Sequence, residues 1–106
     1  MKISIYQPNN PAFRIDPDKR LYDKNTYHEV YTMQLTKEQE KQSYEDVDVL
    51  LEEIFRIFNI NKPEDFKGHS LSVEDIVEIK GDVEEFEKDR EQFICDVFGW
   101  RKISWK

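Results

Sequence analysis

An apolar stripe in the middle of the chain constrains the fold more than any other feature of the sequence. Its members follow the spacing i, i+3, i+4, i+7 and i+11, which places them on one face of an α-helix. They are Val47, Leu50, Leu51, Ile54 and Phe58. Charged residues take the opposite face, and Pro63 prevents the helix from continuing far beyond Asn59. We therefore expect one main amphipathic helix that buries one side against the rest of the protein.

Two capping-box patterns precede this stripe, one at residues 36–39 and one at residues 43–46. In a capping box, the side chains of the first and fourth residues exchange hydrogen bonds with each other's backbone N–H groups. The second pattern stands directly before the stripe, so we expect the helix to begin there. Residues 37–43 would then extend the helix at its front by one or two polar turns.

Stretches that alternate apolar and polar residues lie on both sides of the helix. Alternating β-branched and aromatic residues are typical of half-buried strands. The expected strands are residues 2–7, 27–35, 75–80, 92–98 and 100–105. This order predicts one α+β domain, in which one main helix packs on a small antiparallel, partly barrel-like sheet of about five strands. A chain of 106 residues has the size of a single domain.

The alternation also predicts which side chains share a face of the sheet. In the second strand, Tyr27 and Tyr31 have the same parity and should point to the same side. In the fourth strand, Phe93, Cys95 and Val97 should point to one side. Ile94 and Phe98 should then point to the other side.

Charged residues make up 37% of the chain, and the net charge is −7. The distribution is uneven, because residues 38–91 hold eighteen acidic and seven basic side chains, whereas each flank has a net charge of +2. Phosphate contacts need clustered Lys and Arg, so we do not expect direct binding of nucleic acid. A basic protein surface is a more natural partner. The alternative is a solvated acidic face that only keeps the protein soluble.

Cysteine content and hydropathy bear on the compartment. The single cysteine, Cys95, rules out an internal disulfide and favours a reducing environment. The first eight residues do not resemble a signal peptide, and no apolar run is long enough to span a membrane. These features predict a cytoplasmic protein that has no membrane partner; they leave its oligomeric state open.

The sequence contains no pattern that predicts catalysis or metal binding. A zinc site needs three or four converging ligands, but His28, His69 and Cys95 belong to three separate segments. Cys95 lies in an apolar strand, which disfavours a reactive thiolate. Ser70 and Ser72 lack the surroundings of a catalytic serine. We therefore predict a protein that is not an enzyme and that uses no cofactor and no metal.

Two acidic clusters supply the candidate partner-binding residues. One lies on the main helix, and the other lies in residues 81–91, where we expect a protruding hairpin tip or a short helix. Carboxylates in a row imitate phosphates and can compete for a cationic nucleic-acid groove. The candidates are Asp48, Glu52 and Glu53 in the first cluster, and Asp82, Glu84, Glu85, Glu87 and Asp89 in the second.

Residues 58–77, FNINKPEDFKGHSLSVEDIV, resemble the core of the YodL-like domain family. Residues 27–31, YHEVY, and residues 95–100, CDVFGW, are similar to two other parts of the family pattern. The GHSLSV block is the most specific part of this resemblance. The segments 36–48 and 81–91 look longer and more charged than is usual in the family. We therefore expect a single YodL-like domain of residues 1–106 with two charged insertions.

The resemblance implies a non-enzymatic domain of low-GC Gram-positive bacteria and their conjugative or phage elements. One family member is associated with inhibition of the bacterial actin-like cell-shape protein, and others travel beside anti-restriction genes. No catalytic residues come with the family. The GHSLSV block would be either a binding loop or a rigid turn that holds the helix to the sheet.

These observations favour an acidic inhibitor protein of the anti-CRISPR type, encoded by a mobile element. It would bind a type II RNA-guided nuclease and obstruct the guide or target nucleic acid that such nucleases hold in positively charged channels. The alternative is an inhibitor that binds the actin-like cell-shape protein. A third hypothesis is a ribonuclease that acts on guide RNA and depends on His28 and His69. A fourth is a purely structural accessory domain.

Overall fold

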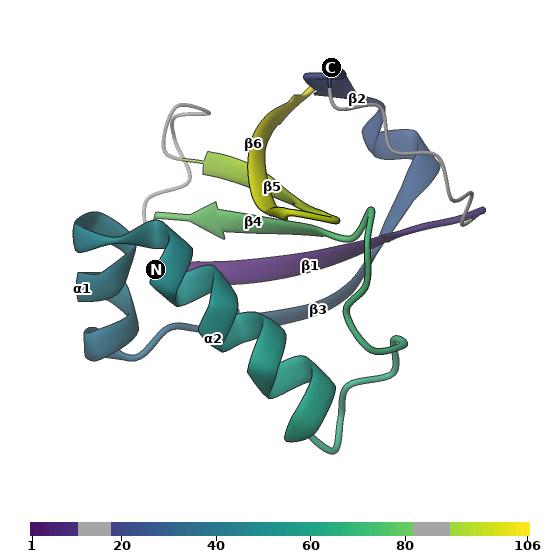
Figure 1. Cartoon of the computed structure of the whole chain (residues 1–106). Helices are drawn as coiled ribbons and strands as arrows, with labels where there is room; N and C mark the ends of the chain where they lie inside the picture. The colour runs from purple at the N-terminus through teal and green to yellow at the C-terminus, as the bar shows by residue number, and fades with distance from the viewer. Residues whose placement is uncertain (11–17, 82–89) are drawn as a thin grey trace.

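The computed structural model describes residues 1–10, 18–81 and 90–106, and Figure 1 shows how their elements are arranged. The strands in these ranges are β1 (Lys2–Pro8), β2 (Leu21–Tyr22), β3 (Tyr27–Gln34), β4 (Ile76–Lys80), β5 (Arg90–Asp96) and β6 (Gly99–Trp105). The helical elements are α1 (Lys37–Glu45), α2 (Val47–Ile60) and a short 3-10 turn, η1 (Lys24–Thr26). The predicted α+β class is confirmed.

The strands form one six-stranded sheet in the order β2-β6-β5-β4-β1-β3. Neighbouring strands are antiparallel except for β2 and β6, which run parallel, so the sheet is mixed. Strand β6 bends away from β4 and β1, and the sheet curls into a half-barrel (Figure 1). The prediction of an antiparallel sheet of about five strands missed β2, because two residues are too few to show an alternating pattern.

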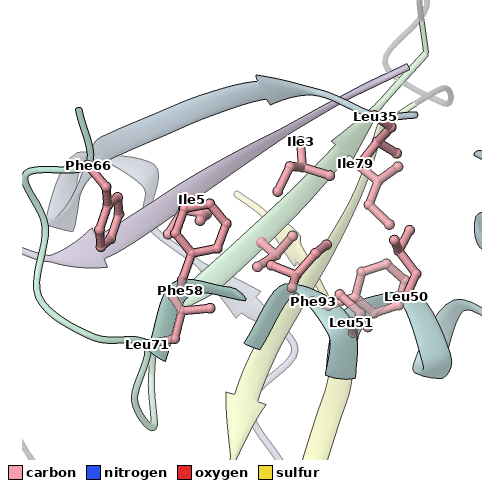
Figure 2. Packing of buried hydrophobic residues seen from close by; sticks show 12 residues of the cluster. Ile3, Ile5, Leu35, Leu50, Leu51, Phe58, Phe66, Leu71, Ile79 and Phe93 are labelled. Carbon is pink, nitrogen blue, oxygen red and sulfur yellow. The ribbon is translucent and has the colours of Figure 1, made fainter. Parts of the chain in front are cut away.

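The apolar stripe of α2 packs against one face of this sheet, which we call the covered face (Figure 2), and α1 packs beside α2. Four residues of the stripe are completely buried, namely Leu50, Leu51, Ile54 and Phe58. Among their neighbours in the core are Ile3, Ile5, Val77, Ile79 and Phe93 from the sheet. Burial of one such side chain contributes about 1.5–3 kcal/mol. The stripe therefore does what the sequence predicts, which is to hold the helical layer to the sheet.

The helical structure expected over residues 37–43 is present as α1, but the capping box that forms is the first of the two and not the second. Thr36 Oγ1 accepts a hydrogen bond from the N–H of Gln39 at 3.1 Å, and Gln39 Oε1 accepts one from the N–H of Thr36 at 2.9 Å. At the second predicted box, Ser43 Oγ donates to the carbonyl of Glu40 instead. Asp46 is extended, with φ −158° and ψ 93°, and separates α1 from α2. The expected single helix is therefore two helices.

A β-bulge in β3 changes the faces that were predicted for this strand. Ile5 of β1 pairs with Tyr31, but the next residue, Tyr6, pairs with Glu29, so Val30 is an extra residue. As a result, Tyr31 packs against the helix-covered core, whereas Tyr27 packs against a second cluster. The prediction that Tyr27 and Tyr31 share a face is wrong, because an inserted residue reverses the alternation.

Strand β5 ends earlier than the sequence suggests, at Asp96. Val97 and Phe98 form the two-residue turn of the hairpin that joins β5 to β6, and they are 63% and 99% exposed. Gly99 follows with a φ of 120°, which only glycine adopts readily. The predicted places of Val97 and Phe98 on the faces of the sheet are therefore wrong, since both residues lie beyond its end.

Candidate functional site

The first acidic cluster lies on α2, away from the buried stripe. Asp48 and Glu52 are exposed, and Glu53 is half-buried. Asp48 and Glu52 are four residues apart, so their carboxylates stand on one side of the helix, about 6 Å apart along its axis. Both are accessible to a partner, although a role in binding stays a prediction.

Exposed apolar side chains accompany these carboxylates at the break between the two helices. Tyr44 is 79% exposed and Val49 is 48% exposed. We call this surface the helix-break patch; its residues are Tyr44, Glu45, Asp46, Asp48, Val49 and Glu52. Tyrosine is enriched at protein interfaces, and surrounding carboxylates select a partner of opposite charge. The patch therefore combines an apolar anchor with a charge that gives specificity.

The second acidic cluster lies outside the described residues. Its members, all within residues 82–89, are Asp82, Glu84, Glu85, Glu87 and Asp89. The hairpin tip or short helix expected near residues 81–91 falls largely in the same stretch. This stretch connects β4 to its antiparallel neighbour β5. The role of the second cluster in partner binding therefore stays a prediction.

The segment between α2 and β4 fixes the helix to the sheet. Phe66 and Leu71 are buried in the helix-covered core. Gly68 lies between them, and a Cβ at this position would come within 2.7 Å of Gln7 Oε1 and 3.0 Å of the Phe66 ring. Only glycine allows so close an approach. These contacts favour the rigid turn over the binding loop as the interpretation of the GHSLSV block.

A buried carboxyl group closes the same turn. Asp75 is completely buried, and its Oδ2 accepts hydrogen bonds from the N–H of Ser72 at 2.9 Å and from Gln7 Nε2 at 3.1 Å. Gln7 Nε2 also donates to the carbonyl oxygen of His69 at 2.8 Å. Burial raises the pKa of Asp75 to about 6, although the hydrogen bond from Ser72 acts in the opposite direction. Asp75 and Gln7 thus link the block to β1.

The residues that sequence analysis weighed for metal or nucleophile chemistry lie on different parts of the fold. His28 Nδ1 lies 2.8 Å from Asn9 Oδ1, and His69 Nδ1 lies 3.1 Å from Gln7 Nε2. Cys95 is buried in β5, and burial raises the pKa of its thiol to about 11. A thiolate nucleophile is therefore disfavoured at neutral pH. Within the described residues, no three side chains of the metal-ligating types converge.

The opposite face of the sheet, which we call the open face, carries a second cluster that is rich in aromatic rings. The buried members of this cluster are Tyr6, Tyr22, Ile76, Ile94 and Ile103. Trp105 meets Tyr6 and Tyr27 edge to face, with ring centres 5.3 and 5.7 Å apart. The concave side of the half-barrel is therefore lined by rings that hold one another in place.

A polar row crosses four strands beside this aromatic cluster. The register of the sheet aligns Thr32, Ser4, Glu78 and Gln92 on neighbouring strands. Ser4 Oγ and Thr32 Oγ1 lie 3.0 Å apart, and Gln92 Nε2 donates to Glu78 Oε2 at 2.9 Å. Ser4, Glu78 and Gln92 are all buried. Buried polar groups destabilise a fold unless they find partners, so this row is the most unusual feature of the open face.

Comparison with known proteins then places the chain in a family. A family model described as the YodL-like domain matches residues 15–105, which is most of the sequence. The chain belongs to the YodL-like domain family. Neither a curated protein nor a solved structure matches it.

The family match gives the motif residues of this YodL-like domain a physical explanation. Phe66, Gly68, Leu71 and Asp75, all from the segment that carried the resemblance, anchor the connection between α2 and β4 to the core and to β1. The match also spans the charged segments 36–48 and 81–91. In the described part of the domain, neither helix has the length and hydropathy needed to cross a membrane.

The polar row of the YodL-like domain was not predicted from the sequence. Glu78 stands in an apolar run of β4 and could have been noticed as a charged residue where a strand should be buried. Its contact with Trp105, 27 residues away in the sequence, follows only from the pairing of β4, β5 and β6. Nothing in the linear sequence gives that register.

Proposed function

We propose that this YodL-like domain is a non-enzymatic inhibitor of the anti-CRISPR type, encoded by a mobile element such as a phage. Its target would be a type II RNA-guided nuclease, whose channels for guide and target nucleic acid are positively charged. The domain would act in the cytoplasm, where these nucleases work. It would bind through its carboxylates and so obstruct the nucleic acid.

The observation that supports this proposal best is the composition of the helix-break patch. Four of its six residues are carboxylates, and the other two are the exposed side chains of Tyr44 and Val49. Carboxylates at a rim accelerate association with a basic surface and make it sensitive to salt. An exposed tyrosine supplies apolar area at a small cost in conformational entropy. Together these features suit a protein partner with a cationic groove.

The distribution of basic residues also favours binding of the partner through the helical layer. The exposed surface of α1 and α2 has more carboxylates than cations. By contrast, Lys24, Arg90 and Lys106 lie together on the open face. A cationic partner would therefore be attracted to the helical layer rather than to the open face. The helical layer is also the part of the described surface that contains the predicted residues Asp48, Glu52 and Glu53.

A pull-down with purified type II nuclease tests the proposal, with and without guide RNA and at low and high salt. We expect salt-sensitive capture of the nuclease by the tagged domain, and we expect guide RNA to weaken it. Asp48→Lys and Glu52→Lys should each weaken capture by about tenfold or more, because each reversal replaces an attraction by a repulsion. Their far-UV circular dichroism should match that of the native domain.

Glu64→Lys is the matched control, because Glu64 is exposed in the segment after α2 and its reversal changes the net charge equally. If Glu64→Lys weakens capture of the nuclease as much as Asp48→Lys does, binding depends on the overall charge of the domain and not on the helix-break patch. No capture in any condition would refute the nuclease as target.

The second candidate target is the actin-like cell-shape protein, and membership of the YodL-like domain family favours it. This proposal predicts that expression of the domain in rod-shaped cells without any CRISPR system causes rounding or swelling. Unchanged cell shape, at an expression level confirmed by immunoblot, would exclude it. The same charge reversals at Asp48 and Glu52 would show whether both targets use the helix-break patch.

A further inference from the structure

A pocket of about 420 Å³ opens on the open face of the sheet. Its lining comes from four elements that are distant in the sequence. The residues that matter here are Lys24 at η1, Glu78 on β4, Arg90 and Gln92 on β5, Trp105 on β6 and Lys106 directly after it. A volume of this size falls in the range of pockets that hold small molecules.

Glu78 gives this pocket an acceptor group that can take a further hydrogen bond. The side chain is completely buried, and its Oε2 accepts hydrogen bonds from Gln92 Nε2 at 2.9 Å and from Trp105 Nε1 at 2.8 Å. Its Oε1 is buried and, among the described residues, has no hydrogen-bond partner. Lys80 Nζ forms an ion pair with Oε1 at 3.6 Å, which is longer than a hydrogen bond. A buried acceptor without a hydrogen bond is rare and costly, so Oε1 is suited to receive an N–H group from a ligand.

The rim of the pocket is positively charged, in contrast to the carboxylate of Glu78. Among the described residues of the lining, Lys24, Arg90 and Lys106 are cations, and Glu78 is the one carboxylate. Lys24 Nζ lies 5.4 Å from the centre of the Tyr6 ring and 6.0 Å from that of Trp105, so it stands over the aromatic wall. Three cations around a small opening favour an anionic group on the ligand.

The indole of Trp105 supplies the third element of recognition. Its Nε1–H is bonded to Glu78, and its ring is braced edge-on by Tyr6 and Tyr27. The side chain of Lys24 lies over this indole. When Lys24 moves aside, the face of the indole can stack against a flat ring of a ligand. Stacking of a nucleobase on an aromatic side chain contributes about 1–3 kcal/mol.

We infer that this pocket binds a 5′-nucleotide whose base carries an amino group. The amino group donates to Glu78 Oε1, the base stacks on Trp105, and the phosphate is held by Lys24, Arg90 and Lys106. A free phosphate would use only the rim, and a simple amine would use only Glu78. A nucleotide is the class of ligand that uses all three. This site lies on the face of the sheet opposite the helices and is independent of the proposed protein partner.

A titration of the ¹⁵N-labelled domain, followed by NMR, tests this inference with three probes. The probes are AMP, purine riboside 5′-monophosphate, which lacks the amino group, and ribose 5-phosphate, which lacks the base. We expect AMP to shift the indole N–H signal of Trp105 and to leave that of Trp100 in place, since Trp100 packs against the helix-covered core. We expect purine riboside 5′-monophosphate to bind about tenfold more weakly or worse, and ribose 5-phosphate more weakly still.

Glu78→Gln separates recognition from folding, because an amide keeps the shape and can keep its oxygen on Gln92 and Trp105. Its NH₂ group would then face the amino group of the base. AMP should bind this variant about tenfold more weakly or worse, while the affinity for purine riboside 5′-monophosphate should change little. Lys24→Ala should weaken both nucleotides, and Lys37→Ala, which removes an exposed lysine of α1, should weaken neither.

Two results would overturn the inference. One is equal affinity for AMP and ribose 5-phosphate, which would reduce the pocket to a cationic patch. The other is the lack of any shift of the Trp105 indole signal at millimolar AMP.

Discussion

The two faces of the sheet bury their side chains in different ways, and two buried carboxyl groups show the difference. Asp75, at the end of the covered face, uses Oδ2 to close a turn of its own chain with Ser72 and Gln7. Glu78, on the open face, lines a pocket with cations at its rim. Each carboxyl has one oxygen that lacks a hydrogen bond among the described residues. Burial of a carboxyl therefore does not define a site; the space and the charges beside it do.

The largest expected effect comes from the covered face. Phe58→Ala should lower the free energy of unfolding by about 3–5 kcal/mol, because it leaves a cavity between α2, Phe66 and Tyr31. Phe98→Ala is the matched control, since Phe98 is 99% exposed and should change stability by less than about 0.5 kcal/mol. Urea denaturation measures both. Similar losses for the two variants would mean that α2 does not supply the core.

The next prediction compares the stability of two variants of Glu78, which lies on the open face. Glu78→Ala should cost about 1–3 kcal/mol of stability, because it leaves the donors of Gln92 and Trp105 without an acceptor. Glu78→Gln should cost clearly less, because an amide oxygen can still accept from both. Urea denaturation of the two variants side by side is the measurement. If both variants lose the same amount of stability, the charge of Glu78 and its ion pair with Lys80 matter more than the two hydrogen bonds.

The third effect concerns Asp75 and appears only as a change of stability with pH. Burial raises the pKa of Asp75 in the folded protein to about 6, above the usual 3.8. The folded state therefore binds a proton more readily than the unfolded chain, and this group makes the free energy of unfolding fall as the pH rises from about 4 to about 6. Asp75→Asn should remove that part of the pH dependence while an oxygen can stay on Ser72. Urea denaturation at several pH values tests this, and an unchanged pH profile would contradict it.

Local patterns in the sequence predicted much of the fold. The stripe from Val47 to Phe58 has the period of a helix, and the helix that it predicts is α2. The alternation in residues 27–35 predicted β3 to within one residue at its end. These predictions succeeded because the signal is contained in residues that are neighbours in the chain.

The errors lie where distant parts of the chain decide the outcome. The bulge at Val30 is set by the register of β3 against β1, and β2 exists only because β6 offers it an edge. The exposed turn at Val97 and Phe98 is apolar, so its composition suggested a continuing strand. For the candidate sites, composition alone was enough to propose Asp48 and Glu52, whose role in binding stays a prediction, but the pocket beside Glu78 depends on how the strands pair.

Hydrogen exchange of the domain alone and in complex with a type II nuclease, followed by mass spectrometry, tests the central claim most directly. We predict slower exchange in the nuclease complex for the backbone of α1 and the first half of α2, and unchanged exchange in β5 and β6. Protection of β5, β6 and their exposed turn at Val97 and Phe98, with no change in α1 and α2, would contradict the assignment of protein binding to the helical face.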